Sequence, residues 1–121
     1  MDDQTYQKEK PKIVEDIKRS VKRIMEQNNA NPNYIGMALQ FAERNMGNYE
    51  PEIRRMAQFR EEARAARDSG DAEKFEQKTA AYGRYSARVA QSIRMSYNAS
   101  VLQSNKEKLK EIAREKAKAH T

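Results

Sequence analysis

Large apolar side chains recur along this chain every three or four residues, with charged residues between them. In residues 51–68 the apolar stripe consists of Ile53, Met56, Ala57, Phe59, Ala63 and Ala66. In residues 72–97 it consists of Phe75, Tyr82 and Val89, with Thr79, Ser86 and Ile93 between them. Such spacing puts each stripe on one face of an α-helix. The pattern therefore predicts two amphipathic helices that bury one stripe each.

The residues between these two helices are typical of a tight turn. Gly70 suits the left-handed backbone just beyond a helix end, and Asp71 suits the N-cap of the following helix. We therefore expect a helix from Pro51 to Asp68 and a second helix from Ala72 onward, packed as an antiparallel hairpin.

Two more helices are predicted in the first half of the chain, at residues 11–28 and 32–46. The first carries apolar residues in steps of three and four, and the second follows a favourable N-cap, Asn31. Pro11, Pro32 and Pro51 all stand where a helix would begin, a position at which the missing N–H of proline costs little. Residues 1–10 are polar, and we expect them to be flexible.

The end of the chain leaves two alternatives open. Ser104 and Glu107 have the spacing of a capping box, so a fifth helix begins there or the fourth helix continues as one rod. No large apolar residue follows Ile112, so residues 113–121 are predicted to fray. No strand pattern occurs. The sequence predicts one all-α domain over residues 1–121, a helical bundle of four to five helices built from two successive antiparallel hairpins.

The amino-acid composition excludes several kinds of chemical site. The 121 residues include no cysteine, which excludes disulfides and thiolate sites, and one histidine, His120, which lies in the predicted frayed tail. The glycines are isolated, and no phosphate-binding loop is present. We therefore expect no catalytic residue, no metal, no cofactor and no small-molecule substrate, and we expect that the protein is not an enzyme.

The N-terminus is acidic and polar, and no apolar run approaches the ~20 residues of a membrane span. We expect no signal peptide, no membrane span and a cytoplasmic location. Charged residues make up 35% of the chain and hydrophobic residues 37%, so the core is lean. We expect self-association or a partner protein to add to the stability of this lean core.

Positive charge is concentrated in the second half. Of the net charge of +6, residues 71–121 contribute 11 basic and six acidic side chains. The candidate contact surface lies on the fourth helix and consists of Lys74, Lys78, Arg84, Arg88 and Arg94. A basic face beside Tyr82 and Tyr85 favours phosphate contacts with tyrosine stacking on a base. In the alternative interpretation both tyrosines are half-buried and the arginines pair with Glu61, Glu62 or Asp68 of the facing helix.

Two hypotheses follow. The first is a non-enzymatic helical interaction protein (an adaptor, chaperone or inhibitor) that acts by contact with another protein or by self-association. The second is an accessory protein that binds nucleic acid through the basic face around residues 74–98. Docking of the basic C-terminal helix on an anionic membrane is a weaker third option.

Overall fold

The computed structural model describes residues 1–119, and these residues form helices joined by short turns, without a strand. This confirms the all-α class. The elements are α1 (Asp3–Gln27), α2 (Pro32–Asn45), a 3-10 helix η1 (Met46–Tyr49), α3 (Glu50–Asp68) and α4 (Ala72–Ala119). The open question about the second half is settled, because the predicted fourth and fifth helices are one continuous helix of 48 residues.

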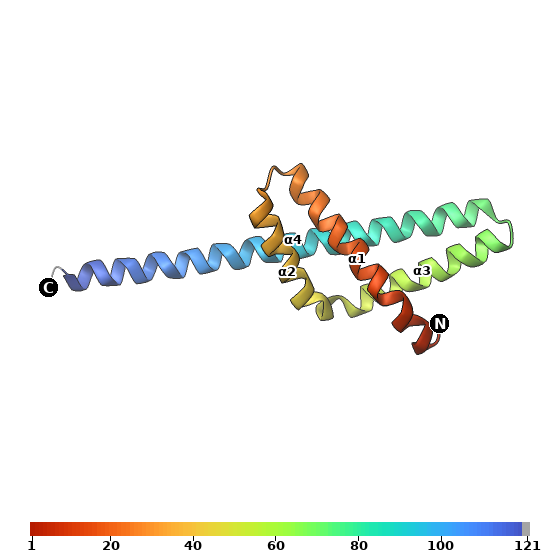
Figure 1. Cartoon of the computed structure of the whole chain (residues 1–121), viewed down its shortest axis with the longest axis horizontal. Helices are drawn as coiled ribbons and strands as arrows, with labels where there is room; N and C mark the ends of the chain where they lie inside the picture. Colours follow the sequence, from red (N-terminus) through yellow and green to blue (C-terminus); the bar gives the residue numbers. More distant parts are fainter. Residues whose placement is uncertain (120–121) are drawn as a thin grey trace.

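Helices α3 and α4 lie side by side and run antiparallel (Figure 1). The turn between them has the predicted chemistry: Gly70 has a φ of 77°, and the Asp71 side chain accepts a hydrogen bond of 3.1 Å from the Lys74 amide. All six residues of the predicted α3 stripe are buried. Of the stripe predicted for residues 72–97, Ser86, Val89 and Ile93 are buried and Tyr82 is half-buried, but Phe75 and Thr79 near the turn are exposed. Local turn chemistry and helical periodicity therefore account for the hairpin but not for burial at its tip.

Helix α1 lies across the α3–α4 hairpin, and α2 turns back from its end (Figure 1). The contacts of α1 are more extensive with α4 and α3 than with α2. The predicted division into two successive hairpins is therefore not confirmed. A serine pair marks the place where α1 and α4 meet: Ser20 and Ser86 are buried, with their hydroxyl oxygens 2.9 Å apart. Small side chains allow a close approach there. Gly83 does not take part in this close approach, because a Cβ at that position would meet nothing within 4 Å.

The prediction of a flexible segment over residues 1–10 is wrong for this structure. Helix α1 begins at Asp3 and continues through Pro11. The Asp2 side chain caps it by accepting a hydrogen bond of 2.7 Å from the Thr5 amide. Tyr6 is buried, and its hydroxyl donates a hydrogen bond of 2.6 Å to Glu50. Tertiary contacts therefore extend the helix eight residues beyond the position at which proline normally begins one.

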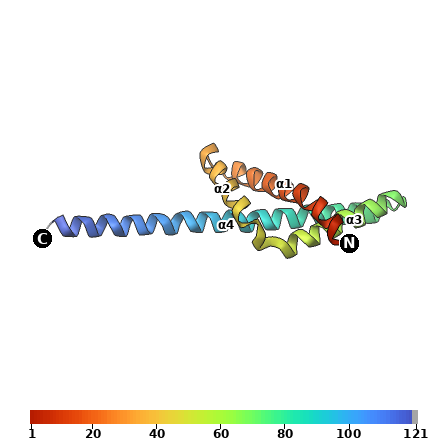
Figure 2. The ribbon, with the colours of Figure 1, turned by 60° about the horizontal axis from the view of Figure 1, so that its bottom comes forward.

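Helix α4 leaves the bundle and continues alone (Figures 1 and 2). We call its last described part, residues 102–119, the arm. Every residue of the arm is exposed. Residues 113–121 were predicted to fray; Ala113–Ala119 are helical in the structure, and the last two residues lie outside the described part. Within residues 1–119, no helix has the length and apolar character that crossing a membrane requires.

The position of Tyr6 generates a first prediction. Tyr6→Ala removes a fully buried aromatic ring and should lower the free energy of unfolding by about 3–4 kcal/mol. Tyr6→Phe keeps the ring and loses only the hydrogen bond to Glu50, so it should cost about 1 kcal/mol. Chemical denaturation measures both values, and hydrogen exchange reports on the amides of residues 7–10. Unprotected amides in the unaltered protein would show that this segment is not helical in solution.

Candidate interaction surface

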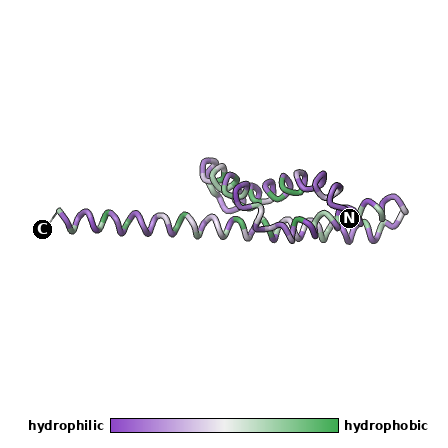
Figure 3. The backbone as a smooth tube through the Cα atoms, turned by 90° about the horizontal axis from the view of Figure 1, so that it is seen from below, coloured by the Kyte–Doolittle hydropathy of each residue, from purple (hydrophilic) through white to green (hydrophobic). Residues whose placement is uncertain are grey.

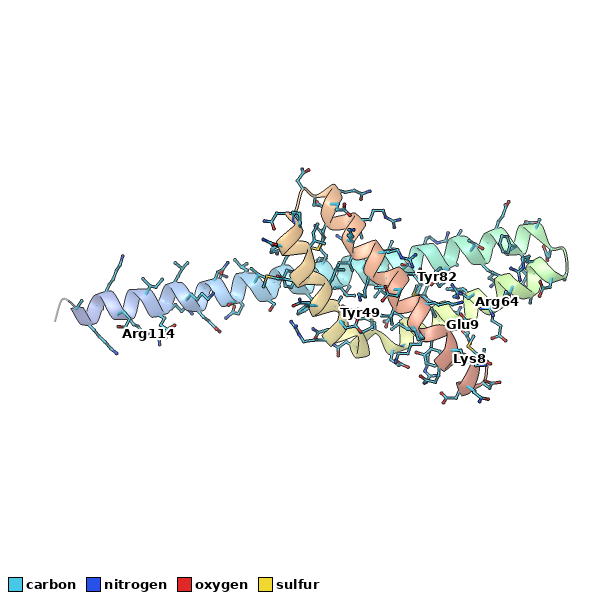
Figure 4. All side chains as sticks on the ribbon, viewed as in Figure 1. Lys8, Glu9, Tyr49, Arg64, Tyr82 and Arg114 are labelled. Atoms are coloured by element: carbon cyan, nitrogen blue, oxygen red, sulfur yellow. The ribbon has the colours of Figure 1, made fainter. Side chains whose placement is uncertain are left out.

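A carboxylate between two arginines fixes α1 over the hairpin. Glu9 on α1 is only 8% exposed. Arg60 on α3 donates a hydrogen bond of 2.7 Å to one of its oxygens, and Arg64, one turn further along α3, donates to the other. Figure 4 shows Glu9 and Arg64 lying close together where α1 crosses α3. Burial alone would raise the pKa of Glu9, but the two arginines outweigh it and hold the pKa below the ordinary glutamate value.

A second polar contact joins α1 to α4. The Tyr82 hydroxyl donates a hydrogen bond of 2.5 Å to Asp16, and Arg60 lies 3.9 Å from the same carboxylate oxygen. Burial, and then the hydrogen bond to Asp16, raises the pKa of the Tyr82 hydroxyl well above its ordinary value. Tyr82 therefore stays neutral at all physiological pH values. The Tyr82 hydroxyl is held by its hydrogen bond to Asp16 of α1, so Tyr82 has a structural role.

The chemistry of an active site is not assembled elsewhere in the described chain. Residues 1–119 contain no group of three or more metal-ligating side chains. A cleft of about 300 Å³ opens between α3 and α4 beside Phe59, Phe75 and Tyr82. The basic side chains at its rim are already paired, Arg60 and Arg64 with Glu9 and Lys78 with Glu62. The cleft therefore offers an apolar wall but no uncommitted charge to bind a ligand.

The five predicted contact residues do not form one face. An α-helix turns by about 100° per residue. Arg84 and Arg88 are therefore neighbours, separated by about 40°, whereas Lys78 lies about 120° from Arg84 and Arg94 about 120° from Arg88. Lys74 is exposed near the turn, about 80° from Arg84. Of the predicted set, the structure places only Arg84 and Arg88 together.

The contacts of these residues also differ. Lys78 forms an ion pair of 2.7 Å with Glu62, whereas the alternative interpretation expected the arginines to pair with the acidic residues of α3. Arg94 is half-buried, and its Nε is buried without a hydrogen-bond partner. Arg84 and Arg88 are exposed and form no ion pair with any residue in the range 1–119. The pairing expected between the arginines and Glu61, Glu62 or Asp68 is therefore absent.

The tyrosines beside this face are engaged. Tyr82 is bound to Asp16, as described above, and the ring of Tyr85 packs edge-on against Phe59 with ring centroids 5.3 Å apart. The Arg88 guanidinium lies over the Tyr85 ring, 5.1 Å from its centroid. The Tyr85 ring is in contact with Arg88 and Phe59, and Tyr82 is half-buried with its hydroxyl bound to Asp16, so the two rings do not form the predicted exposed stacking platform.

A largely exposed surface runs along α4 on the side opposite the buried residues Val89, Ile93 and Tyr97, and α2 reaches it at one point, where the Tyr34 hydroxyl donates a hydrogen bond of 2.5 Å to the side-chain oxygen of Asn98. We call this surface the outward face. Its members lie within about 40° of the direction of Arg84, and they are Arg84, Arg88, Gln91, Met95, Asn98, Leu102, Lys106, Leu109, Ala113 and Lys116. All are exposed except Gln91, which is half-buried. The face contains four cations and no carboxylate.

The exposed apolar side chains of this face are unusual in size and spacing. Met95, Leu102 and Leu109 lie seven residues apart and are 61%, 56% and 66% exposed. Ile112, 52% exposed, lies on the flank of the same face. Figure 3 shows short green, hydrophobic segments along the otherwise purple free end of α4. A seven-residue spacing of apolar side chains is the pattern by which one helix packs along another.

The opposite side of the arm carries glutamates. Eighteen residues make five full turns of an α-helix, so two residues 18 apart point in the same direction. Val89, Ile93 and Tyr97 are buried against the bundle. The residues 18 positions later are Glu107, Glu111 and Glu115, which are all exposed. Beyond the end of the bundle, glutamates thus occupy the direction of α4 that core residues occupy within the bundle. The side of the arm that continues the buried side of α4 is therefore polar.

Comparison of the chain with protein-family models, with curated proteins and with solved structures gives no match. The candidate site is therefore described by its own geometry, the exposed outward face along α4. Sequence reasoning found Arg84 and Arg88 in this surface but did not recognise that they continue into the apolar residues of the arm. The sequence contains this information, because the exposed glutamates of the arm follow the core residues of α4 at a spacing of 18 residues.

The arginine pair around Glu9 generates a second prediction. Glu9→Gln leaves Arg60 and Arg64 without their charged acceptor and should cost about 2 kcal/mol of stability at pH 7. Because the folded pKa of Glu9 is depressed, its contribution is present above its ordinary pKa and is lost as the pH falls through the folded value. The difference between wild type and variant should therefore shrink at acid pH.

Denaturation between pH 7 and pH 3 measures this difference, and Glu15→Gln is the matched control. Glu15 is exposed and pairs only with Lys18, at 3.4 Å, so its replacement should change stability by less than about 0.5 kcal/mol. Equal effects of the two substitutions would contradict the structural part assigned to Glu9.

Proposed function

We propose that this protein is a non-enzymatic interaction protein that uses the outward face of α4 to bind another protein. The observation that carries the proposal is the arm, which exposes Leu102 and Leu109 along 18 residues that no other element of the described chain covers. Figure 4 shows side chains around Arg114 projecting from the arm with no neighbouring element beside them. Whether the protein acts as an adaptor, a chaperone or an inhibitor depends on the partner.

The energetics of a single helix support this proposal. Most helical stability in proteins comes from packing of an apolar face, so a helical segment that packs on nothing is only weakly stabilised. The arm receives none of that stabilisation from the bundle. A partner that covered Met95, Leu102 and Leu109 would remove their exposed apolar surface from water and stabilise the arm at the same time.

Site-specific photo-crosslinking tests the proposal. A photoreactive amino acid in place of Leu102 or Leu109, in cells that express the protein, should give discrete covalent adducts with a protein. The same group in place of Glu107 or Glu111, on the opposite side of the arm, should give none. Adducts that are absent at all four positions, or equal on both sides, would defeat the proposal.

A second candidate function, nucleic-acid binding, is favoured by one observation: Arg84 and Arg88 are exposed neighbours without an ion pair in the described chain. Such a pair can contact phosphates, although the engaged tyrosines remove the stacking contribution. The exposed Leu102 and Leu109 further along the same face contribute nothing to phosphate binding, which places this candidate second.

If the second candidate is correct, single- or double-stranded DNA or RNA should bind at low salt, with affinity that falls steeply as salt rises. Arg84→Glu combined with Arg88→Glu should abolish this binding. Lys12→Glu combined with Arg23→Glu, an equal charge change on exposed positions of α1, should retain most of it. Equal losses in both double variants would show that only the net charge matters.

A further inference from the structure

The outward face has a charge pattern that specifies the chemistry of its partner. Cations lie at both ends of the face: Arg84 and Arg88 in the part of α4 that belongs to the bundle, and Lys106 and Lys116 on the arm. The apolar residues lie between and among them. From Arg84 to Lys116 the face spans 32 residues, or about 48 Å of helix. The face is long, narrow and straight, which fits another helix lying alongside.

We infer that the occupant of the outward face is an acidic amphipathic helix of another protein. This inference rests on the proposed function and names the partner's chemistry. The partner helix would place apolar side chains, seven residues apart, against Met95, Leu102 and Leu109. Carboxylates on its flanks would lie beside Lys106 and Lys116, and carboxylates at its end beside Arg84 and Arg88. The arrangement is that of a two-stranded coiled coil.

A second copy of the chain is a poor occupant, because the face has no carboxylate to offer. In a parallel pair, Arg84 and Arg88 of each copy would lie beside the same residues of the other. In an antiparallel pair that places Leu102 opposite Leu102 and Met95 opposite Leu109, Arg88 would lie beside Lys116 of the other copy. Like charges placed together destabilise helix pairs, and neither orientation forms a single ion pair between the two faces. The glutamates of the arm lie on the far side and reach neither.

A membrane surface also fits poorly. An amphipathic helix that lies in the interface inserts a broad apolar side, commonly with aromatic residues. The outward face has one narrow row of three large apolar side chains and no aromatic residue. A row of this width matches the seam of a helix pair. A polyanion without apolar groups would leave Leu102 and Leu109 exposed.

The experiment uses the full chain and a synthetic peptide of about four heptads, with leucine at a and d and glutamate at e and g. The peptide should bind and should increase the helicity of the complex above the sum of its parts. An isosequential peptide with lysine at e and g should not bind. Fluorescence anisotropy measures affinity and circular dichroism measures helicity.

Two double variants locate the binding. Lys106→Glu with Lys116→Glu changes two cations of the outward face and should weaken the acidic peptide by at least about tenfold. Lys108→Glu with Arg114→Glu makes the same change of net charge about 120° to either side of the face. This control should bind within about twofold of wild type. Leu102→Ser with Leu109→Ser should abolish binding if the apolar row is the seam.

Several outcomes would overturn the inference. The inference fails if the acidic peptide does not bind, or if both charge variants weaken its binding equally. It also fails if sedimentation shows self-association that Leu102→Ser with Leu109→Ser removes, or if anionic vesicles or duplex DNA bind through Lys106 and Lys116 where the peptide does not. If crosslinks form at Leu109 but the acidic peptide does not bind, only the partner's chemistry is wrong. If no crosslinks form and the peptide does not bind, the proposed function fails as well.

Discussion

The position of α1 depends on one buried carboxylate. Glu9 accepts hydrogen bonds from Arg60 and Arg64, which lie one turn apart on α3, and this fixes where along the hairpin α1 crosses. The contact between Asp16 and Tyr82 then ties the same helix to α4. Helices α1, α2 and α3 all pack against α4, and they leave Arg84, Arg88, Met95 and the arm exposed. The outward face, which we propose as the interaction surface, is thus a consequence of how the bundle is held together.

These polar contacts contribute more to geometry than to net stability. Taking a carboxylate and a guanidinium out of water costs much of what their attraction returns. Apolar stripes alone, however, tolerate sliding of one helix along another, whereas Glu9 accepts both arginines in only one register. The buried pair Ser20 and Ser86 adds a close contact at the crossing. The core is therefore lean, and hydrogen bonds specify the position of α1 along the hairpin.

Local patterns predicted much of the fold. The turn at residues 68–71 and the buried stripe of α3 followed from capping chemistry and helical spacing, which depend on near neighbours. The helix over residues 3–10 did not follow, because its support comes from Glu50, Arg60 and Arg64, which are more than 40 residues away. No local pattern in a polar segment before Pro11 reveals that support.

The candidate site was predicted only in part, for a different reason. Lys78 and Arg94 were grouped with Arg84 and Arg88 by proximity in the sequence, although the rotation of an α-helix separates them. The direction of each residue could be calculated from the sequence, but which direction faces the bundle could not. That required the packing of Val89, Ile93 and Tyr97. Once the buried side is known, the outward face follows by rotation alone.

The unbroken course of α4 has a mechanical consequence. The helix passes from bundle to arm without a proline, a kink or a change of register, so the rotational phase of the arm is set by the packing of the bundle. A molecule held at Leu109 would sit about 30 Å along the axis from Val89, at a fixed angle about that axis. The arm therefore moves rigidly with the bundle part of α4. A small rotation of α4 against α1 changes the position of any molecule bound at the far end of the arm.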